Sequence, residues 1–235
     1  MPWTPHFTLG HENAGWVQEL GEGVDELEVS QPVAVVGAWG CGRCSRCRAG
    51  LETYCDRPDL APVPGGGGGL GLDGGMAEFL LVPAARHPVP LPDGLDPVRA
   101  APLTDAGLTP YHAVRRSREK LTPGAVALGI DVGGLGHLGI QVLRATTGGM
   151  LGDLTIVGLG GGTLPVSFFG IPYEVSAQTT YWGNRAELVE VLDLAARGLL
   201  HAEITRFELD QAERAYGLLR SGAVDGRVVV VPNGA

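Results

Sequence analysis

The chain has 235 residues, 44% of them apolar and 18% charged, which is enough for one large or two modest globular domains. Its net charge of −9 argues against nucleic acid and anionic membranes as partners, because both need a positively charged face. No apolar run is long enough to span a membrane, and the first thirty residues lack the basic start and apolar core of a signal peptide. We therefore expect a cytoplasmic protein.

The stretch Gly10-His11-Glu12 places an imidazole beside a carboxylate near the start of the sequence. Such a pair can act as a metal ligand with its orienting neighbour, or it can be a surface pair without a function. The apolar residues 33–36 then predict a buried strand that leads into the cysteine-rich segment.

All four cysteines lie close together, at Cys41, Cys44, Cys47 and Cys55, with the spacing C-x2-C-x2-C-x7-C. Four thiolates in one short loop can surround zinc tetrahedrally, and they leave no open position for a substrate. Two disulfides and an iron–sulfur cluster are the alternatives, although reduced cysteines in the cytoplasm favour a metal over disulfides. The spacing predicts a structural zinc site.

Glycine and proline divide the remainder of the first hundred residues into short segments. Residues 64–69, with five consecutive glycines, predict a flexible turn, and no helix start follows that would make this run a phosphate-binding loop. Residues 74–82 predict a turn into another strand. Short strands separated by such turns are typical of a barrel-like β domain.

The pattern changes in the second half of the chain. Residues 125–130 are an apolar run suited to a buried parallel strand, and the sequence Asp131-Val132-Gly133-Gly134-Leu135-Gly136 follows. Apolar residues at 135, 138, 142 and 145 then have helical spacing. Strand, glycine turn and helix open a dinucleotide-binding βαβ unit, although Asp131 stands where the fingerprint has its first glycine.

The last third of the chain predicts further alternating elements. Residues 153–158 predict a strand parallel to 125–130, and residues 173–182 an extended segment. Apolar residues at 188, 191, 192 and 195 predict an amphipathic helix that ends at Gly198. A helix beginning at Asp210, with residues 212, 215, 216 and 219 buried, and a strand over 227–231 complete the prediction.

In this order, these segments resemble the zinc-containing medium-chain alcohol dehydrogenases, especially the bacterial secondary-alcohol enzymes. The resemblance covers nearly the whole chain, and its matching stretches are residues 10–12, the four-cysteine lobe, and residues 75–79, 102–111, 133–137 and 181–183. It implies an α/β protein with a GroES-like β-barrel catalytic domain, a structural zinc lobe and a truncated Rossmann-like parallel sheet. It also implies zinc and NAD as cofactors, with hydride transfer between NAD and a small alcohol or ketone.

The resemblance also assigns roles and domains. His11 and Asp105 would bind a catalytic zinc with Glu12 beside them, and Tyr181 and Trp182 would line the substrate pocket. The coenzyme would lie over the turn that contains Gly133, Gly134 and Gly136, while Cys41, Cys44, Cys47 and Cys55 would hold the structural zinc. The implied division is 1–113 for the catalytic domain, 114–183 for the coenzyme domain and 184–235 for the return to the catalytic domain. A homo-oligomer is compatible with this family.

Two departures from the family pattern leave two functions open. Family members begin upstream with a segment that carries the third ligand of the catalytic zinc, a cysteine, and a proton-relay hydroxyl. After Gly148-Gly149 the sequence also lacks the strand whose acidic residue holds the coenzyme ribose. The chain is therefore expected to be either an alcohol dehydrogenase or a catalytically inactive remnant that acts as a zinc module or interaction protein.

Overall fold

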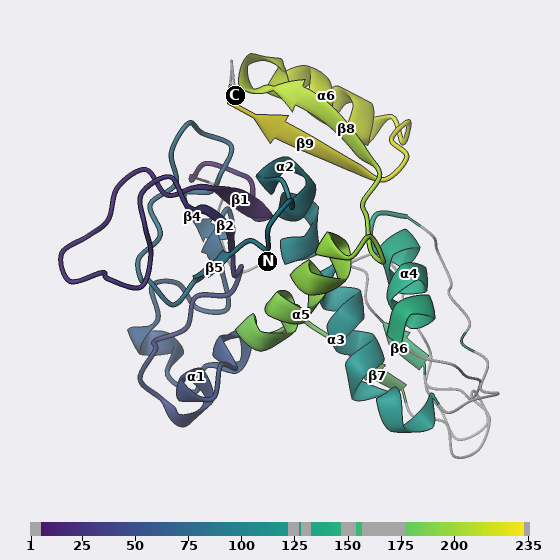
Figure 1. The fold of residues 1–235 in the computed structure, drawn as a ribbon, viewed down its shortest axis with the longest axis horizontal. Coiled ribbons are helices and arrows are strands. Elements are labelled where there is room, and N and C mark those ends of the chain that lie inside the picture. The colour runs from purple at the N-terminus through teal and green to yellow at the C-terminus, as the bar shows by residue number, and fades with distance from the viewer. Residues whose placement is uncertain (1–5, 122–126, 128–132, 147–153, 157–176, 233–235) are drawn as a thin grey trace.

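The computed structural model describes residues 6–121, 127, 133–146, 154–156 and 177–232. Figure 1 shows three groups of elements: a β-rich part with the cysteine lobe at the left, a cluster of helices at the lower right, and a strand–helix–strand unit at the top. The elements of the β-rich part are β1 (Asn13–Trp16), β2 (Pro32–Val35), α1 (Ser45–Arg48), β3 (Gly67–Gly68), β4 (Gly71–Leu72) and β5 (Pro88–Pro90).

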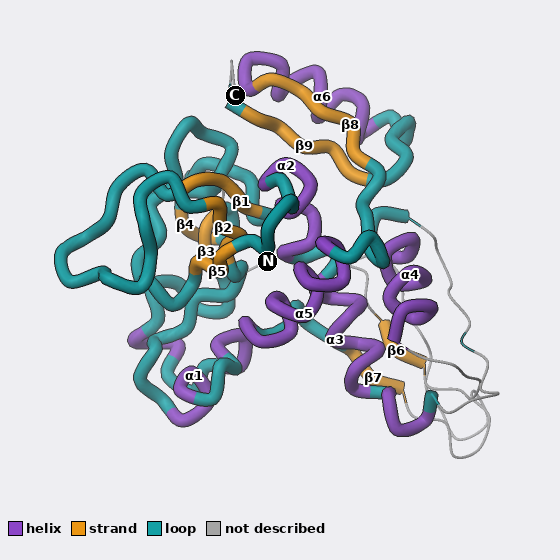
Figure 2. Tube along the Cα trace, in the orientation of Figure 1, coloured by secondary structure: helices purple, strands orange, loops and turns teal. Residues whose placement is uncertain are grey.

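The main sheet of the β-rich part has three antiparallel strands in the order β1-β2-β5. In its centre, Ala34 lies opposite Ala14 of β1 and Val89 of β5. Residues 33–36 are buried, so the predicted strand is confirmed at β2. Figure 2 shows how short these strands are and how much of this part consists of loops.

The glycine run begins with the predicted turn at Pro64 and Gly65, but the rest of the run is packed inside the β-rich part, so the prediction that the whole run is flexible was wrong. Gly66, Gly67, Gly68 and Gly69 are buried, and two of them form β3. A side chain on Gly68 would put its Cβ 2.9 Å from the Trp39 ring, so the absence of side chains lets the run lie against neighbouring backbone and rings. The glycine-rich composition indicated a flexible backbone, whereas the buried glycines allow the backbone to pack closely against its neighbours.

The strand predicted within residues 74–82 does not form. These residues make bends and irregular structure, and Phe79 and Leu81 are 68% and 88% exposed. A strand needs a neighbour to complete its hydrogen-bond ladder, and no described strand pairs with this segment. The apolar composition alone was therefore misleading.

Four helices connect the sheet to the second half of the chain: α2 (Pro97–Ala100), α3 (Leu108–Arg116), α4 (Gly136–Thr146) and α5 (Arg185–Ala196). Helix α3 lies between α4 and α5 and contacts both. One continuous cluster of buried apolar side chains extends from β2 and β5 through Leu103 into these helices. The predicted helical faces are confirmed, since Leu138 and Val142 of α4 and Leu188 and Val191 of α5 are fully buried.

The parallel strands of the second half are described only in part. Strand β6 (Leu154–Ile156) confirms a strand within 153–158, and β7 (Ala177–Thr179) confirms part of the extended segment. These two strands pair in parallel, with Thr155 opposite Gln178. Apart from Ala127, the strand predicted over 125–130 lies outside the described residues, so its pairing with β6 stays a prediction.

The strand–helix–strand unit consists of β8 (Ile204–Glu208), α6 (Ala212–Arg220) and β9 (Arg227–Val231). The two strands pair in parallel over their whole length, which confirms the predicted final strand. Helix α6 begins two residues later than predicted, after a 3-10 turn over Leu209–Gln211. Of its predicted buried face only Ala215 is fully buried, and Leu219 is 47% exposed, because this helix covers a narrow two-stranded sheet.

Among the described helices, none has the length and apolar character that crossing a bilayer requires. The implied domain boundaries at residues 113 and 183 stay a prediction, since α3 and α5, which lie at these boundaries, pack directly against each other.

The central position of α5 can be tested with two neighbouring residues. We expect Leu188→Ala to lower the free energy of unfolding by about 2–5 kcal/mol, because it removes a fully buried side chain from the core. Val189 follows on the same helix and is 43% exposed, so Val189→Ala should change the stability by less than about 0.5 kcal/mol. Urea unfolding of both variants measures the difference, and equal losses would contradict the packing described here.

Candidate functional site

The four cysteines form a compact cluster that fits one metal ion. Their sulfur atoms all lie within 4.8 Å of one another, and two of the separations are 3.9 Å for Cys41–Cys47 and 4.0 Å for Cys44–Cys55. Tetrahedral zinc with Zn–S bonds of about 2.3 Å requires sulfur separations of about 3.8 Å. None of the four forms a disulfide, so the arrangement has the donor type and geometry of a closed zinc site.

Backbone N–H groups point at the sulfur atoms of this lobe. Cys41 Sγ accepts from Arg43 and Cys44, and Cys44 Sγ accepts from Cys47, each at 3.4 Å. The N–H of Cys47 is the main reason that the pKa of Cys44 is lowered to about 6. Burial raises the pKa of Cys47, and a bound cation would oppose that rise. The loop is thus shaped to hold thiolates.

The second candidate site joins His11, which precedes β1, to Asp105, which precedes α3. His11 Nε2 lies 3.0 Å from Asp105 Oδ2, although the residues are 94 positions apart. The other carboxylate oxygen of Asp105 accepts from the Thr109 hydroxyl at 2.5 Å, which fixes the orientation of the carboxylate. Zinc bonds of about 2.0–2.2 Å at a tetrahedral angle separate two such donors by about 3.3 Å. A zinc ion therefore fits after a shift of a few tenths of an ångström.

The pKa values of His11 and Asp105 are shifted in opposite directions, and each shift favours the charged form. Burial works to lower the pKa of His11, but the hydrogen bond and charge of Asp105, with the charge of Glu12, outweigh it and raise the pKa. Burial works to raise the pKa of Asp105, but the hydrogen bonds from His11 and Thr109 and the charge of His11 outweigh it and lower the pKa. A metal cation binding here would replace the imidazole proton as the partner of the carboxylate.

Glu12 lies beside this pair, and both of its carboxylate oxygens have partners. Oε1 accepts from the Ala106 N–H at 2.9 Å, and Oε2 forms an ion pair with Arg227 at the start of β9. Burial raises the pKa of Glu12, and the charge of Arg227 works against that rise. No sequence motif contains Arg227, whose only signal is its position as a lone cation at the head of a valine-rich strand.

The glycine turn that was predicted to face a coenzyme leads into α4. The N–H of His137 donates to Gly133 O at 3.2 Å, and the helix begins at Gly136. The Arg227 guanidinium lies against Gly134, where a Cβ would be 2.7 Å from Nη1. Arg227 thus contacts the turn as well as Glu12 and connects the two predicted sites, while Asp131 lies outside the described residues.

Trp182 lies beside His11, and Tyr181 lies beside Trp182, whereas their role in lining a substrate pocket stays a prediction. The Trp182 ring meets the His11 ring edge-on, with 6.1 Å between their centroids. The Tyr181 and Trp182 ring centroids are 5.4 Å apart. Trp182 is 3% exposed and has a positive φ of 52°, a backbone conformation that is uncommon outside glycine. Its indole N–H is buried and has no hydrogen-bond partner among the described residues, so it is available to a ligand.

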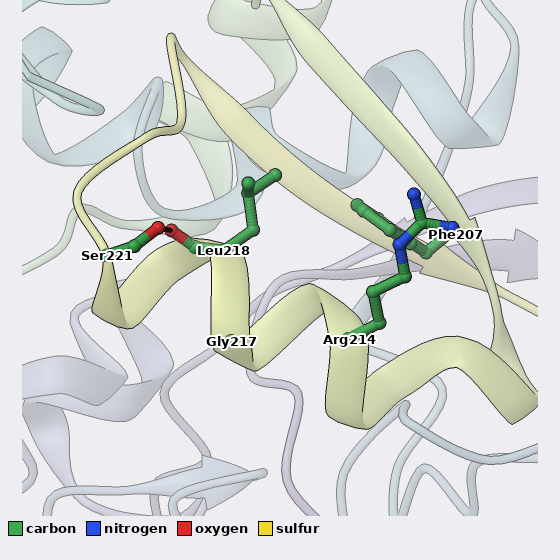
Figure 3. A pocket seen from close by; sticks show the side chains of 5 residues that line it. All are labelled: Phe207, Arg214, Gly217, Leu218 and Ser221. Atoms are coloured by element: carbon green, nitrogen blue, oxygen red, sulfur yellow. Dashed lines mark hydrogen bonds between the residues drawn. The ribbon is translucent and has the colours of Figure 1, made fainter.

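Two cavities lie apart from this arrangement. One of about 390 Å³ opens between α6 and β8, where the Arg214 guanidinium lies 5.8 Å from the Phe207 ring centroid (Figure 3). Another of about 210 Å³ lies beside the cysteine lobe and is bordered by Trp39, Glu52 and Cys55. Neither cavity is lined by His11 or Asp105.

Two family models match most of the sequence. Residues 1–93 match the alcohol dehydrogenase GroES-like domain, and residues 110–230, just over half of the chain, match the zinc-binding dehydrogenase model. An alcohol dehydrogenase of Geobacillus stearothermophilus is 27% identical over 285 residues, covering 94% of this chain and 81% of that protein. The alignment is longer than this chain, so the relative carries residues inside the matched region that this chain lacks.

Solved structures agree with the family models. The crystal structure of the alcohol dehydrogenase from the hyperthermophilic archaeon Aeropyrum pernix is 30% identical, with a TM-score of 0.85 over 96% of this chain and 83% of that chain. Acetophenone reductase from Geotrichum candidum, solved in complex with NAD, has the same fold at 24% identity, with a TM-score of 0.83 over 98% of this chain and 82% of its own. By its sequence and its fold, the chain belongs to the zinc-binding alcohol dehydrogenases, which combine a GroES-like domain with a Rossmann domain.

Proposed function

We propose that this chain is built for hydride transfer between NAD and a small alcohol or ketone, with weakened coenzyme binding. The observation that carries the proposal is the contact of His11 with Asp105 beneath Trp182. These residues come from three separate segments of a chain whose homologues are alcohol dehydrogenases. In this proposal His11 and Asp105 hold the catalytic zinc, and the four cysteines hold the structural zinc.

The residues around the proposed centre have separable tasks. Zinc bound there would supply a Lewis acid that lowers the pKa of an alcohol hydroxyl and polarises a carbonyl. His11 and Asp105 would bind the zinc ion, and the Thr109 hydroxyl holds the Asp105 carboxylate in place. Trp182 covers the centre and excludes water, and its unpaired indole N–H can donate to a substrate oxygen.

The coenzyme would be held less firmly than the metal. Its pyrophosphate would lie over the turn that contains Gly133 and Gly136, at the N-terminus of α4, where free backbone N–H groups and the helix dipole attract phosphate. Arg227 beside Gly134 adds a positive charge at this end of the helix. Asp131 and the residues that are lacking inside the matched region act in the opposite direction.

A second candidate is a zinc-stabilised protein without hydride chemistry, such as an interaction module. The observation that favours it is the alignment with the relatives, which is longer than the chain itself. Under either function, four unpaired cysteines that can hold a metal favour a reducing compartment such as the cytoplasm. A homo-oligomer is a further proposal, since among the described residues no other strand pairs with the outer edges of β8 and β9.

The zinc content separates the two metal positions. We expect one tightly held zinc per chain, because stable zinc sites use three or four protein ligands and His11 and Asp105 supply only two. Glu12 is not free to join them, since both its oxygens are bonded. Metal analysis after gel filtration should therefore show one zinc in the wild type and in His11→Ala, and none in Cys44→Ser.

Ser45→Ala, at the neighbouring position of α1, is the control for the cysteine variant and should retain its zinc. Two tightly held zinc ions in the wild type, one of them lost in His11→Ala, would contradict the expected weakness of the second site.

Oxidation of 2-propanol tests the proposed chemistry. With added zinc and NAD at millimolar concentration, we expect slow NAD reduction that is abolished by His11→Ala, because the substitution removes one of the two metal donors. His201→Ala is the control. The His201 side chain is 56% exposed and pairs only with Glu203 among the described residues, and His201 bonds Gln141 of α4 through its backbone, so this substitution should leave the rate unchanged. Absence of NAD reduction in the wild type would favour the second candidate.

The affinity for NADH tests whether coenzyme binding at the glycine turn is weakened. We expect no NADH binding at micromolar concentration, because a carboxylate at Asp131 opposes the phosphates and like charges at an interface cost several kcal/mol, or roughly a thousandfold at about 4 kcal/mol. Asp131→Gly should restore only part of the affinity, since a charged hydrogen bond to the ribose, worth about 1.5–3 kcal/mol, is still missing. Fluorescence titration measures both chains, and a micromolar dissociation constant for the unmodified chain would overturn this expectation.

A further inference from the structure

Glu52 gathers three donors at the edge of the cysteine lobe. Its carboxylate accepts from the Gly40 N–H at 2.7 Å, from Arg86 Nε at 2.6 Å and from His87 Nε2 at 3.1 Å. The Glu52 side chain is 11% exposed and the Arg86 side chain 40%, so the bonds from Gly40 and His87 are partly buried and the bond from Arg86 is more exposed. Burial works to raise the pKa of Glu52, but the bonds from His87 and Arg86 outweigh it and lower the pKa. The carboxylate is therefore a charged acceptor tied to the residue before Cys41.

Arg86 contacts the zinc loop on both sides of Cys41. Its Nη2 donates to Gly40 O at 3.0 Å, so Arg86 and Glu52 together hold both backbone polar groups of Gly40. Its guanidinium also lies against Gly42, where a Cβ would be 2.8 Å from Cζ, and Gly42 has a positive φ of 71°. The two neighbours of Cys41 are thus fixed by one arginine–glutamate pair.

The pair is anchored to the rest of the fold. Arg185 at the start of α5 donates from Nε to Arg86 O at 3.1 Å. His87 is 1% exposed and its ring stacks on the Trp39 ring, with centroids 5.5 Å apart and planes at 14°. Because Arg86 and His87 lead directly into β5, the contacts connect the zinc loop to the sheet and to α5.

The charge of Arg86 also suits this position. Four thiolates around a divalent zinc ion carry an excess of negative charge, which a neighbouring cation stabilises. Arginine can donate to a carboxylate and to a carbonyl at the same time through its planar fork, which lysine cannot reproduce. Arg86 uses its fork in this way, on Glu52 and on Gly40.

We propose that Arg86 and Glu52 form a clamp that positions Cys41 and slows the loss of zinc from the four-cysteine lobe. They are positioning residues, since neither is a ligand. The proposal rests on the structural zinc of the proposed function and is independent of hydride transfer. Partners that orient metal ligands typically change metal affinity by about 10–100-fold when they are removed.

The test is the rate at which the zinc-loaded full-length chain releases zinc to excess chelator, followed with a metallochromic dye. We expect Arg86→Ala and Glu52→Gln to release zinc about 10–100-fold faster than the wild type. Arg57→Ala is the matched control. Arg57 also pairs with a carboxylate on the lobe, Asp59, and its charge acts on Cys41 and Cys55, but among the described residues its only hydrogen bond to a cysteine sulfur comes from its backbone N–H. This control therefore removes a nearby cation without removing side-chain hydrogen bonds to the zinc loop.

Replacement of zinc by cobalt separates positioning from general stability. The thiolate-to-cobalt absorption bands report the arrangement of the sulfur atoms, and we expect them to shift in Arg86→Ala and Glu52→Gln but not in Arg57→Ala. Arg86→Lys, which keeps the charge without the fork, should recover part of the slow release. If Arg86→Ala folds poorly, Glu52→Gln, which preserves the size of the side chain, gives the same measurement.

The clamp is overturned if both variants release zinc as slowly as the wild type with unchanged cobalt spectra, or if Arg57→Ala accelerates release to the same extent. These outcomes differ from failure of the proposed metal site, which would appear as a wild-type chain that retains no zinc at the cysteines. They also leave the proposed hydride transfer at His11 and Asp105 unaffected.

Discussion

The ion pair between Glu12 and Arg227 joins residues 215 positions apart and ties three parts of the molecule together. Glu12 follows His11 ahead of β1, Arg227 opens β9, and the Arg227 guanidinium also lies against Gly134 before α4. Both side chains are largely shielded, and removing one partner of a buried pair leaves an uncompensated charge at a cost of about 3–5 kcal/mol. The proposed catalytic centre and the glycine turn are therefore placed relative to each other by the last strand of the chain.

The two metal positions differ in how much of the fold they require. The cysteine lobe closes within one short loop, where backbone N–H groups and a single turn of helix aim the sulfur atoms. The His11–Asp105 position exists only when the segment before β1 and the segment before α3 are brought together by the sheet and the helical core. A local disturbance of the core would thus affect the second position before the first.

The same difference explains what the sequence could predict. The spacing of the cysteines and the helical faces of α4 and α5 are local patterns, and the structure confirms them. His11 and Asp105 could be paired only through the family resemblance, because no local rule links residues 94 positions apart. The contacts of Arg86 had no sequence signal of their own, and Arg227 had only its position at the head of a valine-rich strand. The buried glycine run was misread because composition does not tell which surfaces a segment will meet.

This chain lacks residues that the relative carries inside the matched region, and their loss affects coenzyme binding more than zinc binding. Zinc binding needs a few donors at fixed distances, and the turn that leads to Asp105 packs against α5, which contacts α3 directly. Dinucleotide binding instead needs several consecutive parallel strands, since the phosphates lie at the first turn and the ribose at the end of the next strand. Shortening that series removes coenzyme contacts without opening the core around Leu108 and Leu188. A chain of this kind can therefore lose coenzyme affinity while its fold and its metal lobe persist.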